Sequence, residues 1–300
     1  MNAIIPIFII FIPPILYAFC NVWESRAMNG VFKSVPVTYF YAIFSVMLFS
    51  IPILVMSGQL TVIPADMLAL SAAEAVLSVI SIIIYYHAIK LIDVSVSQAL
   101  YGAGAAVIPF MGMWIFGEYM NAMELAGFFI IIISGIMSSI DDLKRPRLNR
   151  GFFLMILATA ALYAHILIEK EVVETVGWAN SAFYHELMFM LSAALIFMIP
   201  KYRAAITVNY SSYKKNLRPF LIYGLFGAIA MMTSHYVVGE VPIALKEGVG
   251  GTQPFFVLIF AYILARIGLP GAKEEFTRAK VVQKVVCFAA MFIGLLMLLH

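Results

Sequence analysis

Charge is scarce in this chain and cysteine is almost absent. Only 12% of the 300 residues are Asp, Glu, Lys or Arg, whereas soluble domains carry about 25%. The two cysteines, Cys20 and Cys287, lie in or beside apolar runs, so we expect neither a disulfide framework nor a thiolate metal site. The first three residues carry no basic side chain. We therefore expect the first apolar run to remain as a helix rather than to act as a secretory signal.

Motifs of enzymes and of nucleic-acid-binding proteins are also missing. The sequence has no Gly-rich phosphate loop, no His-Glu-x-x-His helix and no nucleophile elbow. Its net charge of +3 is spread through loops, whereas a nucleic-acid-binding face concentrates Lys and Arg. We expect a protein that is not an enzyme, holds no cofactor or metal ion, and binds no nucleic acid.

Long apolar runs are what the sequence has in abundance. Hydrophobic residues make up 63% of the chain, and runs of about 20 residues, enough to cross a hydrocarbon core roughly 30 Å thick, recur throughout. Continuous runs indicate helices, because a spanning β-barrel would show short alternating segments. The expected fold class is an all-α polytopic membrane protein with ten transmembrane helices. The expected spans are 3–22, 35–56, 67–89, 94–116, 122–140, 150–169, 180–200, 219–238, 243–266 and 281–299.

A repeat in the sequence divides these spans into two sets of five. The segment 99–110, ALYGAGAAVIPF, returns 145 positions later at 244–255 as ALKEGVGGTQPF, and Tyr17 has a counterpart 146 positions later in Tyr163. Because each copy holds an odd number of spans, the second copy must lie upside down relative to the first. Inverted repeats are typical of secondary transporters, which bind substrate where the repeats meet. The expected repeats are residues 1–145 and 146–300.

A pattern at the end of the fourth span of each copy identifies a resemblance to a known family. A proline lies within that span, a Gly-Glu pair follows in the first copy, and a glycine lies in the next span. These residues are Pro109, Gly117-Glu118 and Gly127 or Gly135 in the first copy, and Pro254 and Gly294 in the second. Along its whole length the chain resembles the ten-helix transporters of the drug/metabolite transporter superfamily, which are built from two EamA-type domains. The resemblance implies a basket of helices around a central cavity, with the fifth and tenth helices peripheral, and transport of small organic solutes.

The two prolines are the expected hinges of the transport path. A proline inside a helix removes a backbone hydrogen bond and kinks the rod. In lipid, the freed carbonyl is tolerated where neighbouring helices or a wet cavity satisfy it. The glycines that precede each proline have close helix packing as their alternative role. The candidate kink and gating residues are Pro109, Pro254, Gly102, Gly104, Gly250 and Gly251.

Ionisable residues deep inside the spans are the candidate binding groups, because a charge at mid-bilayer costs a few kcal/mol. Glu74 lies about 12 Å into its span at 1.5 Å per residue, among small residues. We expect it to face a cavity and either to bind a cationic part of the substrate or to carry a coupling proton; the alternative is a packing hydrogen bond. Tyrosine rings attract cations and would frame the same cavity. The expected substrate-binding residues are Tyr17, Glu74, Tyr85, Tyr163, His165, Tyr184, His185, Glu186 and His235.

Basic residues gather in one set of loops. Seventeen of the 19 Lys and Arg residues follow the odd-numbered spans, including five in the segment 201–218, which we expect to hold an interfacial helix. The positive-inside rule places these loops in the cytoplasm and both termini outside. The resemblance implies the opposite orientation, with both termini cytoplasmic.

These patterns together predict a multi-pass protein of the cytoplasmic (inner) membrane that works in the lipid bilayer as a monomer or homodimer. Its expected function is secondary transport of a small organic metabolite, such as an amino acid or amine, by alternating access. A proton is the candidate coupling ion. The alternatives are a multidrug or toxin exporter, a flippase for a lipid-linked sugar, and a structural membrane subunit.

Overall fold

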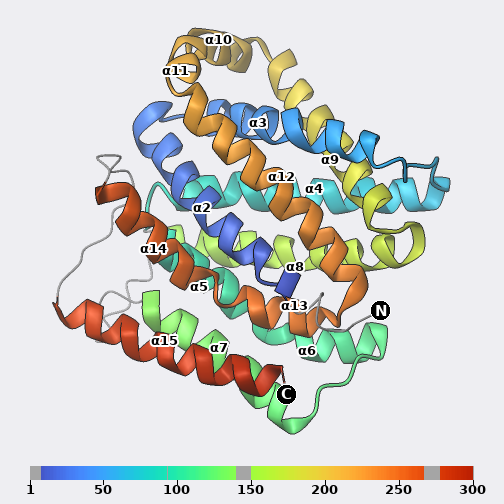
Figure 1. The fold of residues 1–300 in the computed structure, drawn as a ribbon. Coiled ribbons are helices and arrows are strands. Elements are labelled where there is room, and N and C mark those ends of the chain that lie inside the picture. The colour runs from blue at the N-terminus through green and yellow to red at the C-terminus, as the bar shows by residue number, and fades with distance from the viewer. Residues whose placement is uncertain (1–7, 93, 140–149, 267–277, 300) are drawn as a thin grey trace.

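The protein is described by a computed structural model over residues 8–92, 94–139, 150–266 and 278–299, and within these ranges its regular structure is entirely helical (Figure 1). Six helical segments there are long and apolar enough to cross a membrane. They are α3 (Val35–Met56), α4 (Ala65–Ala88), α8 (Arg150–Val176), α9 (Trp178–Met198), α12 (Leu217–Glu240) and the combined segment Ile243–Arg266. The prediction of an all-α, multi-pass membrane protein is confirmed at this level.

The other helices are shorter or interrupted. Helix α2 (Ile12–Arg26) continues into a π-helical turn, η1 (Ala27–Val31). Two expected spans are broken into consecutive pieces: α5 (Val94–Gly104), η2 (Ala105–Val107), α6 (Ile108–Met111) and η3 (Gly112–Phe116) form one, and α13 (Ile243–Gly250) and α14 (Gln253–Arg266) form the other. The remaining helices are α7 (Ala122–Ser139), α10 (Pro200–Val208), α11 (Tyr210–Lys215) and α15 (Arg278–Leu298).

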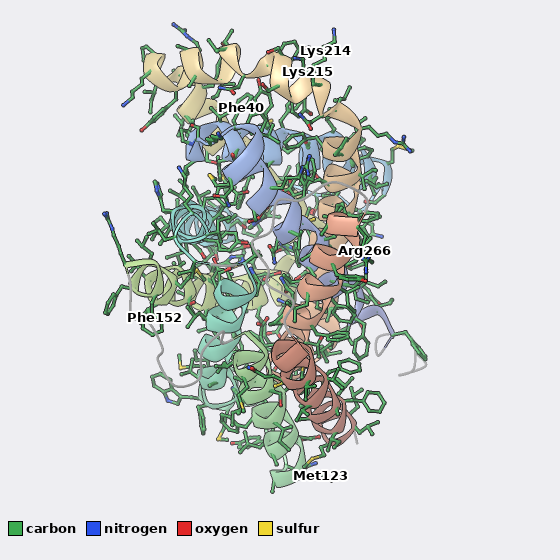
Figure 2. The ribbon with its side chains drawn as sticks, turned by 90° about the vertical axis from the view of Figure 1, so that its left-hand side faces the viewer. Phe40, Met123, Phe152, Lys214, Lys215 and Arg266 are labelled. Atoms are coloured by element: carbon green, nitrogen blue, oxygen red, sulfur yellow. The ribbon has the colours of Figure 1, made fainter. Side chains whose placement is uncertain are left out.

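Polarity is distributed in the opposite way to a soluble protein. Large apolar side chains are exposed on several helices, including Phe153 at 60% and Phe292 at 55%, whereas Glu74 and Glu169 are 0% and 2% exposed. A soluble monomer rarely leaves so much contiguous apolar surface in water. Exposed apolar side chains of this kind, among them Met123 in Figure 2, are therefore what a lipid-facing exterior requires.

Helix packing joins the two halves of the chain throughout the interior. Helix α4 packs along α8, and α2 packs along α12. Helix α3 contacts both α9 and α12, and α4 also contacts α9. Helices α7 and α15 pack on each other at one edge of the molecule (Figure 1). Each of these pairs combines a helix from before residue 140 with one from after residue 149, so the interior is built by both halves.

Most predicted spans match helices closely, and the differences have physical causes. The span 35–56 coincides with α3, whereas α8 runs seven residues past its predicted end, where Lys170 is buried inside the protein. The expected interfacial helix within 201–218 is two short helices, and Tyr213 is buried there against Tyr41 rather than exposed. The loop that joins the halves, 140–149, and the insertion at 267–277 lie outside the described residues.

Candidate functional site

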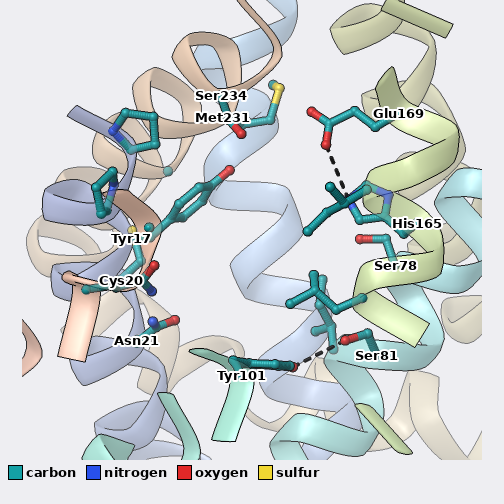
Figure 3. Close-up of a pocket in the computed structure, with 18 of the residues that line it drawn as sticks. Tyr17, Cys20, Asn21, Ser78, Ser81, Tyr101, His165, Glu169, Met231 and Ser234 are labelled. Atoms are coloured by element: carbon teal, nitrogen blue, oxygen red, sulfur yellow. Dashed lines mark hydrogen bonds and ion pairs between the residues drawn. The ribbon is translucent and has the colours of Figure 1, made fainter. Parts of the chain in front are cut away.

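A cavity of about 340 Å³ lies between the two halves of the molecule (Figure 3). Its walls come from α2, α3, α4, α5, α8, α9, α12, α13 and the start of α14. This volume falls within the range of roughly 300–1,000 Å³ that small-molecule sites occupy. The cavity is the candidate site because most of the buried ionisable groups surround it.

Seven of the nine predicted binding residues line this cavity: Tyr17, Tyr85, Tyr163, His165, His185, Glu186 and His235. Glu74 is 0% exposed and is not part of the wall, but it touches the cavity histidines from behind. Tyr184 lies away from the cavity, where its hydroxyl donates to the backbone carbonyl of Thr61 at 3.2 Å. Most residues predicted from the sequence therefore line the cavity, whereas Glu74 lies behind the lining histidines and does not itself face the cavity.

The predicted hinge prolines lie at helix breaks. Pro109 is the second residue of α6 and directly follows the 3-10 turn η2. Pro254 is the second residue of α14 and follows the turn at Gly251 and Thr252. Both prolines lie in the first turn of a helix. A backbone N–H there has no partner within the helix, so the N–H that proline lacks costs no hydrogen bond. Each proline thus marks the start of a new helix segment rather than the middle of a kinked one.

The predicted hinge glycines fall into two groups. Gly102, Gly250 and Gly251 line the cavity. Gly104 does not, because it packs against α8: a Cβ atom added there would lie 2.7 Å from Cε2 of Tyr163. Gly104 serves close packing of two helices, which is the alternative role of glycine in membrane proteins.

Three histidines and two glutamates form a connected polar cluster in and directly behind one wall. Oε1 of Glu74 accepts a hydrogen bond from Nδ1 of His185 at 2.7 Å, and lies 3.5 Å from Nδ1 of His165 and 4.0 Å from Nε2 of His235. Glu169 approaches two of these rings: its Oε2 lies 3.9 Å from Nε2 of His165 (Figure 3), and its Oε1 lies 3.4 Å from Nδ1 of His235. These side chains come from α4, α8, α9 and α12, so the cluster depends on the packing of four helices.

Lys246, on α13, is the lysine in the cavity wall. Its Nζ lies 3.7 Å from Oε2 of Glu169 and 3.2 Å from Oε1 of Glu247. Glu24 and Glu186 add two further carboxyl groups to the lining. Carboxyl groups therefore outnumber lysines in the wall, and a cavity lined by one sign of charge concentrates ions of the opposite sign.

An amide pair connects the two interrupted helices beside the cavity. Nε2 of Gln253 donates to Oε1 of Gln98 at 3.1 Å, and Nε2 of Gln98 donates to the hydroxyl of Tyr85 at 3.4 Å. Gln98 lies on α5 and Gln253 begins α14. The contact therefore ties the two broken helices to each other where they border the cavity.

Several lining residues were not predicted from the sequence. They are Glu24, Gln98, Glu169, Lys246, Glu247 and Gln253. Two signals were available for some of them. Glu169 follows His165 by four residues and so lies on the same helix face, and the Lys246-Glu247 pair lies inside the repeated segment 244–255.

The comparisons with known proteins support the fold and leave the function open. No protein-family model and no curated protein matches the chain. Twenty-nine chains of solved structures are similar to it. One is a crystal structure of a protein that aligns with 95% of this chain and 96% of its own, at a TM-score of 0.62 and 11% identity. At this identity the similarity establishes a shared fold alone, and that fold extends over nearly the whole of both chains.

Proposed function

We propose that the protein is a secondary transporter that carries a small, positively charged organic metabolite, such as an amine or an amino acid, across the cytoplasmic membrane by alternating access. The observation that carries this proposal is the 340 Å³ cavity between the two halves, whose wall combines tyrosine rings with several carboxyl groups. No enzymatic step is needed to account for this site.

The proposal includes ten spans arranged as two inverted five-helix repeats, residues 1–145 and 146–300. Equivalent positions would be α2 and α8, α3 and α9, α4 and α12, α5–η3 and α13–α14, and α7 and α15. If each helix is replaced by its equivalent in the other repeat, the contact between α4 and α8 becomes a contact between α12 and α2. In the same way, the contact between α3 and α12 becomes one between α9 and α4. All four contacts are observed. The contacts α3–α9 and α7–α15 map onto themselves. This symmetry of packing supports two copies related by a two-fold axis, as in inverted-repeat transporters.

The two broken helices support a binding site at the interface of the repeats. Both breaks, at η2 and at the turn after α13, occur in equivalent positions. Substrate sites of secondary transporters are commonly built from discontinuous helices, because unwound backbone is tolerated where it borders a cavity. We propose that these breaks absorb the change in helix geometry when the cavity opens to one side and then to the other.

Charge and size support a small cation as the substrate. The carboxyl groups of Glu24, Glu186 and Glu247 reach the wall together with Lys246, and tyrosine rings such as Tyr17 offer faces that attract cations. The cavity lies near the lower end of the volume range of ligand sites. A small metabolite fits this volume better than the bulky lipid-linked sugar that the flippase alternative requires.

Glu24 offers the sharpest test, because its carboxyl group lies in the cavity wall outside the histidine cluster. Its Oε1 accepts a hydrogen bond from the hydroxyl of Tyr223 at 2.7 Å, and a Gln side chain would retain that bond. Purified protein would be screened by thermal shift against amines, amino acids, sugars and nucleosides, and hits would be tested for counterflow in proteoliposomes. We expect Glu24→Gln to weaken the affinity for a cationic hit about tenfold, or ~1.4 kcal/mol.

The matched control is Glu240→Gln, which removes an exposed carboxyl group at the end of α12 and should leave affinity unchanged. Counterflow that cannot be detected with any binding compound would contradict transport. Preference for neutral amphipathic drugs, with equal affinity in Glu24→Gln, would favour the multidrug exporter instead.

A further inference from the structure

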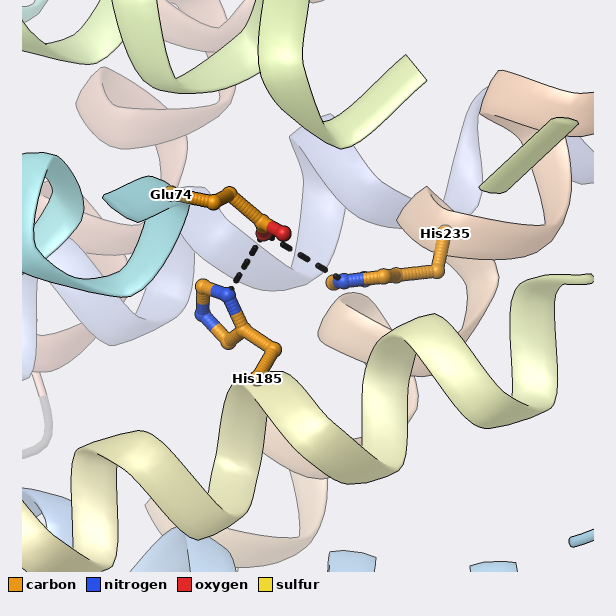
Figure 4. Close-up of side chains that lie close together, drawn as sticks. All are labelled: Glu74, His185 and His235. Atoms are coloured by element: carbon orange, nitrogen blue, oxygen red, sulfur yellow. Dashed lines mark hydrogen bonds and ion pairs between the residues drawn. The ribbon is translucent and has the colours of Figure 1, made fainter. Parts of the chain in front are cut away.

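We propose that Glu74, His185 and His235, completed by His165, form a binding site for one divalent transition-metal ion of the Zn²⁺ class (Figure 4). The site belongs to the polar cluster described above: the three histidines line the cavity, and Glu74 lies behind them. This inference goes beyond the transport of an organic metabolite and does not rest on it.

The spacing of the potential ligand atoms is that of a metal site. One atom each from Glu74, His185 and His235 lie within 4.8 Å of one another. Bonds of about 2.0–2.2 Å to nitrogen and carboxylate oxygen place the ligands of a tetrahedral ion roughly 3.3 Å apart. The observed separations from Oε1 of Glu74 are 2.7 Å to Nδ1 of His185, 3.5 Å to Nδ1 of His165 and 4.0 Å to Nε2 of His235. These values bracket the required distance, so modest side-chain rotations would bring Glu74, His185 and His235 onto one ion. His165 is the proposed fourth ligand because its Nδ1 faces the same oxygen of Glu74.

Four buried atoms in this cluster have no hydrogen-bond partner among the described residues: one is Oε1 of Glu169, and the other three belong to the proposed ligands. Those three are Oε2 of Glu74, Nδ1 of His165 and Nε2 of His235. Their side chains are 0%, 10% and 4% exposed, so solvent does not compensate them. A buried polar atom without a partner costs about 1–3 kcal/mol. A metal ion coordinated by these atoms would remove that cost.

The outward-facing ring nitrogens have the partners that metal-bound histidines require. Nδ1 of His235 donates to the backbone carbonyl of Met231 at 3.0 Å, which leaves Nε2 with its lone pair toward Glu74. Nε2 of His165 lies 3.9 Å from Oε2 of Glu169, an ion-pair distance that a small rotation would shorten to a hydrogen bond, and Nδ1 of the same ring faces Oε1 of Glu74. Histidine ligands usually donate their second ring N–H to a carbonyl or carboxylate, because this fixes the tautomer and the ring orientation.

His185 requires one change of protonation on metal binding. Its Nδ1 donates a hydrogen bond to Oε1 of Glu74. When Nδ1 coordinates a metal ion, that proton moves to Nε2 of the same ring, and no other reactant is needed. The ring then coordinates in its neutral form, as histidine ligands do.

The ligand set selects the class of ion. Three imidazole nitrogens and one carboxylate oxygen suit zinc, nickel, cobalt or copper, whereas magnesium and calcium prefer oxygen ligands alone. Four helices supply the ligands, as in the metal sites of helical bundles whose facing helices direct side chains inward. A divalent cation would also be stabilised by Glu169 and Glu186, two further carboxyl groups of the same wall.

Direct metal binding tests the proposal without any transported substrate. Protein purified with its affinity tag removed would be stripped with a chelator and titrated with Co²⁺, whose visible absorption reports a low-symmetry site, and with Zn²⁺ by calorimetry. We expect one ion per chain, intense Co²⁺ bands, and displacement of Co²⁺ by Zn²⁺. His235→Ala should weaken the affinity at least tenfold and change the Co²⁺ spectrum.

The matched control is His87→Ala, which removes an exposed histidine from the same helix as Glu74 and should leave both readouts unchanged. If His235→Ala does not yield monodisperse protein, Glu74→Gln tests the same site with a side chain of equal size. Absence of Co²⁺ bands, or binding that His87→Ala weakens as much as His235→Ala, would overturn the proposal. Metal binding without counterflow of any organic compound would support this inference and contradict the proposed function.

Discussion

Lys170 illustrates how single residues hold the interior of this protein together. It lies on α8 at 3% exposed, with Nζ 2.7 Å from Oε1 of Glu118 and 2.9 Å from Oε1 of Glu174. Glu118 also accepts the backbone N–H of Ile243, the first residue of α13, at 2.8 Å. One lysine and one glutamate thereby connect α8, the segment before α7, and the start of an interrupted helix.

We expect Lys170→Met to lower the free energy of unfolding by about 3 kcal/mol, because it leaves the side chain of Glu118, only 16% exposed, without its cation. Thermal unfolding in detergent would measure the loss. Glu174→Gln is the control, since Glu174 is 48% exposed and its pair with Lys170 should contribute little. An equal effect of the two substitutions would contradict a structural role for the buried pair.

The sequence predicted polar residues at depth but not which of them meet. Glu74 and the histidines stood out because charged or polar groups are costly in an apolar span. Their convergence depends on how α4, α8, α9 and α12 pack, which no local pattern encodes. Glu169 is the last residue of the predicted span 150–169 and was not among the predicted binding residues, yet it is 2% exposed and contacts two of the histidines.

At the scale of helices, α7 and α15 form a close contact between the halves. A Cβ atom added to Gly127 would lie 2.5 Å from the carbonyl oxygen of Gly294, and one added to Gly294 would lie 2.7 Å from the carbonyl oxygen of Gly127. Each glycine therefore makes room for the other backbone, as small residues do at membrane helix interfaces. In the sequence these two residues are glycines of the span that follows each proline, and in the structure both have a packing role.

We expect Gly294→Ala to separate α7 from α15 and to lower the thermal unfolding midpoint in detergent, because the added methyl group meets backbone that cannot rotate away. Gly30→Ala is the matched control. Gly30 has no atom within 4 Å of an added Cβ, and the substitution should leave the midpoint nearly unchanged. A midpoint in Gly294→Ala equal to that of the parent would show that this interface is looser than the structure indicates.

Helix positions were largely predictable, whereas helix breaks were not. Continuous apolar runs fix the long helices, and 35–56 was predicted without error as α3. The breaks at η2 and after α13 were expected only as kinks at Pro109 and Pro254. Their form depends on tertiary contacts, such as the packing of Gly104 against Tyr163, which lie outside the range of any local signal.

At the scale of the whole molecule, the basic residues separate into two populations. Most lie in the loops predicted to be cytoplasmic, where Lys214 and Lys215 are exposed on α11 (Figure 2). The two exceptions, Lys170 and Lys246, lie inside the protein and pair with glutamates. The two positive charges that depart from the loop asymmetry therefore have carboxylate partners, and neither is an exposed loop charge.

This asymmetry yields a prediction on orientation. Under the proposed ten-span arrangement, an odd number of spans separates Met123 from Lys214, so the two positions lie on opposite sides of the membrane. Both side chains are exposed, and the native cysteines, Cys20 and Cys287, are buried. In a cysteine-free background, we expect an impermeant thiol reagent applied to intact cells to label Met123→Cys and to spare Lys214→Cys, because the positive-inside rule places α11 in the cytoplasm.

Permeabilised cells provide the control, since both cysteines should label once the reagent reaches the two sides. The reverse pattern in intact cells would show that this chain follows the orientation implied by its resemblance to the ten-helix transporters, with the loop charges overruled. Labelling of both positions in intact cells would contradict an odd number of spans between them. In that case the two halves could not be inverted copies, and the shared cavity would need a different explanation from alternating access between two related repeats.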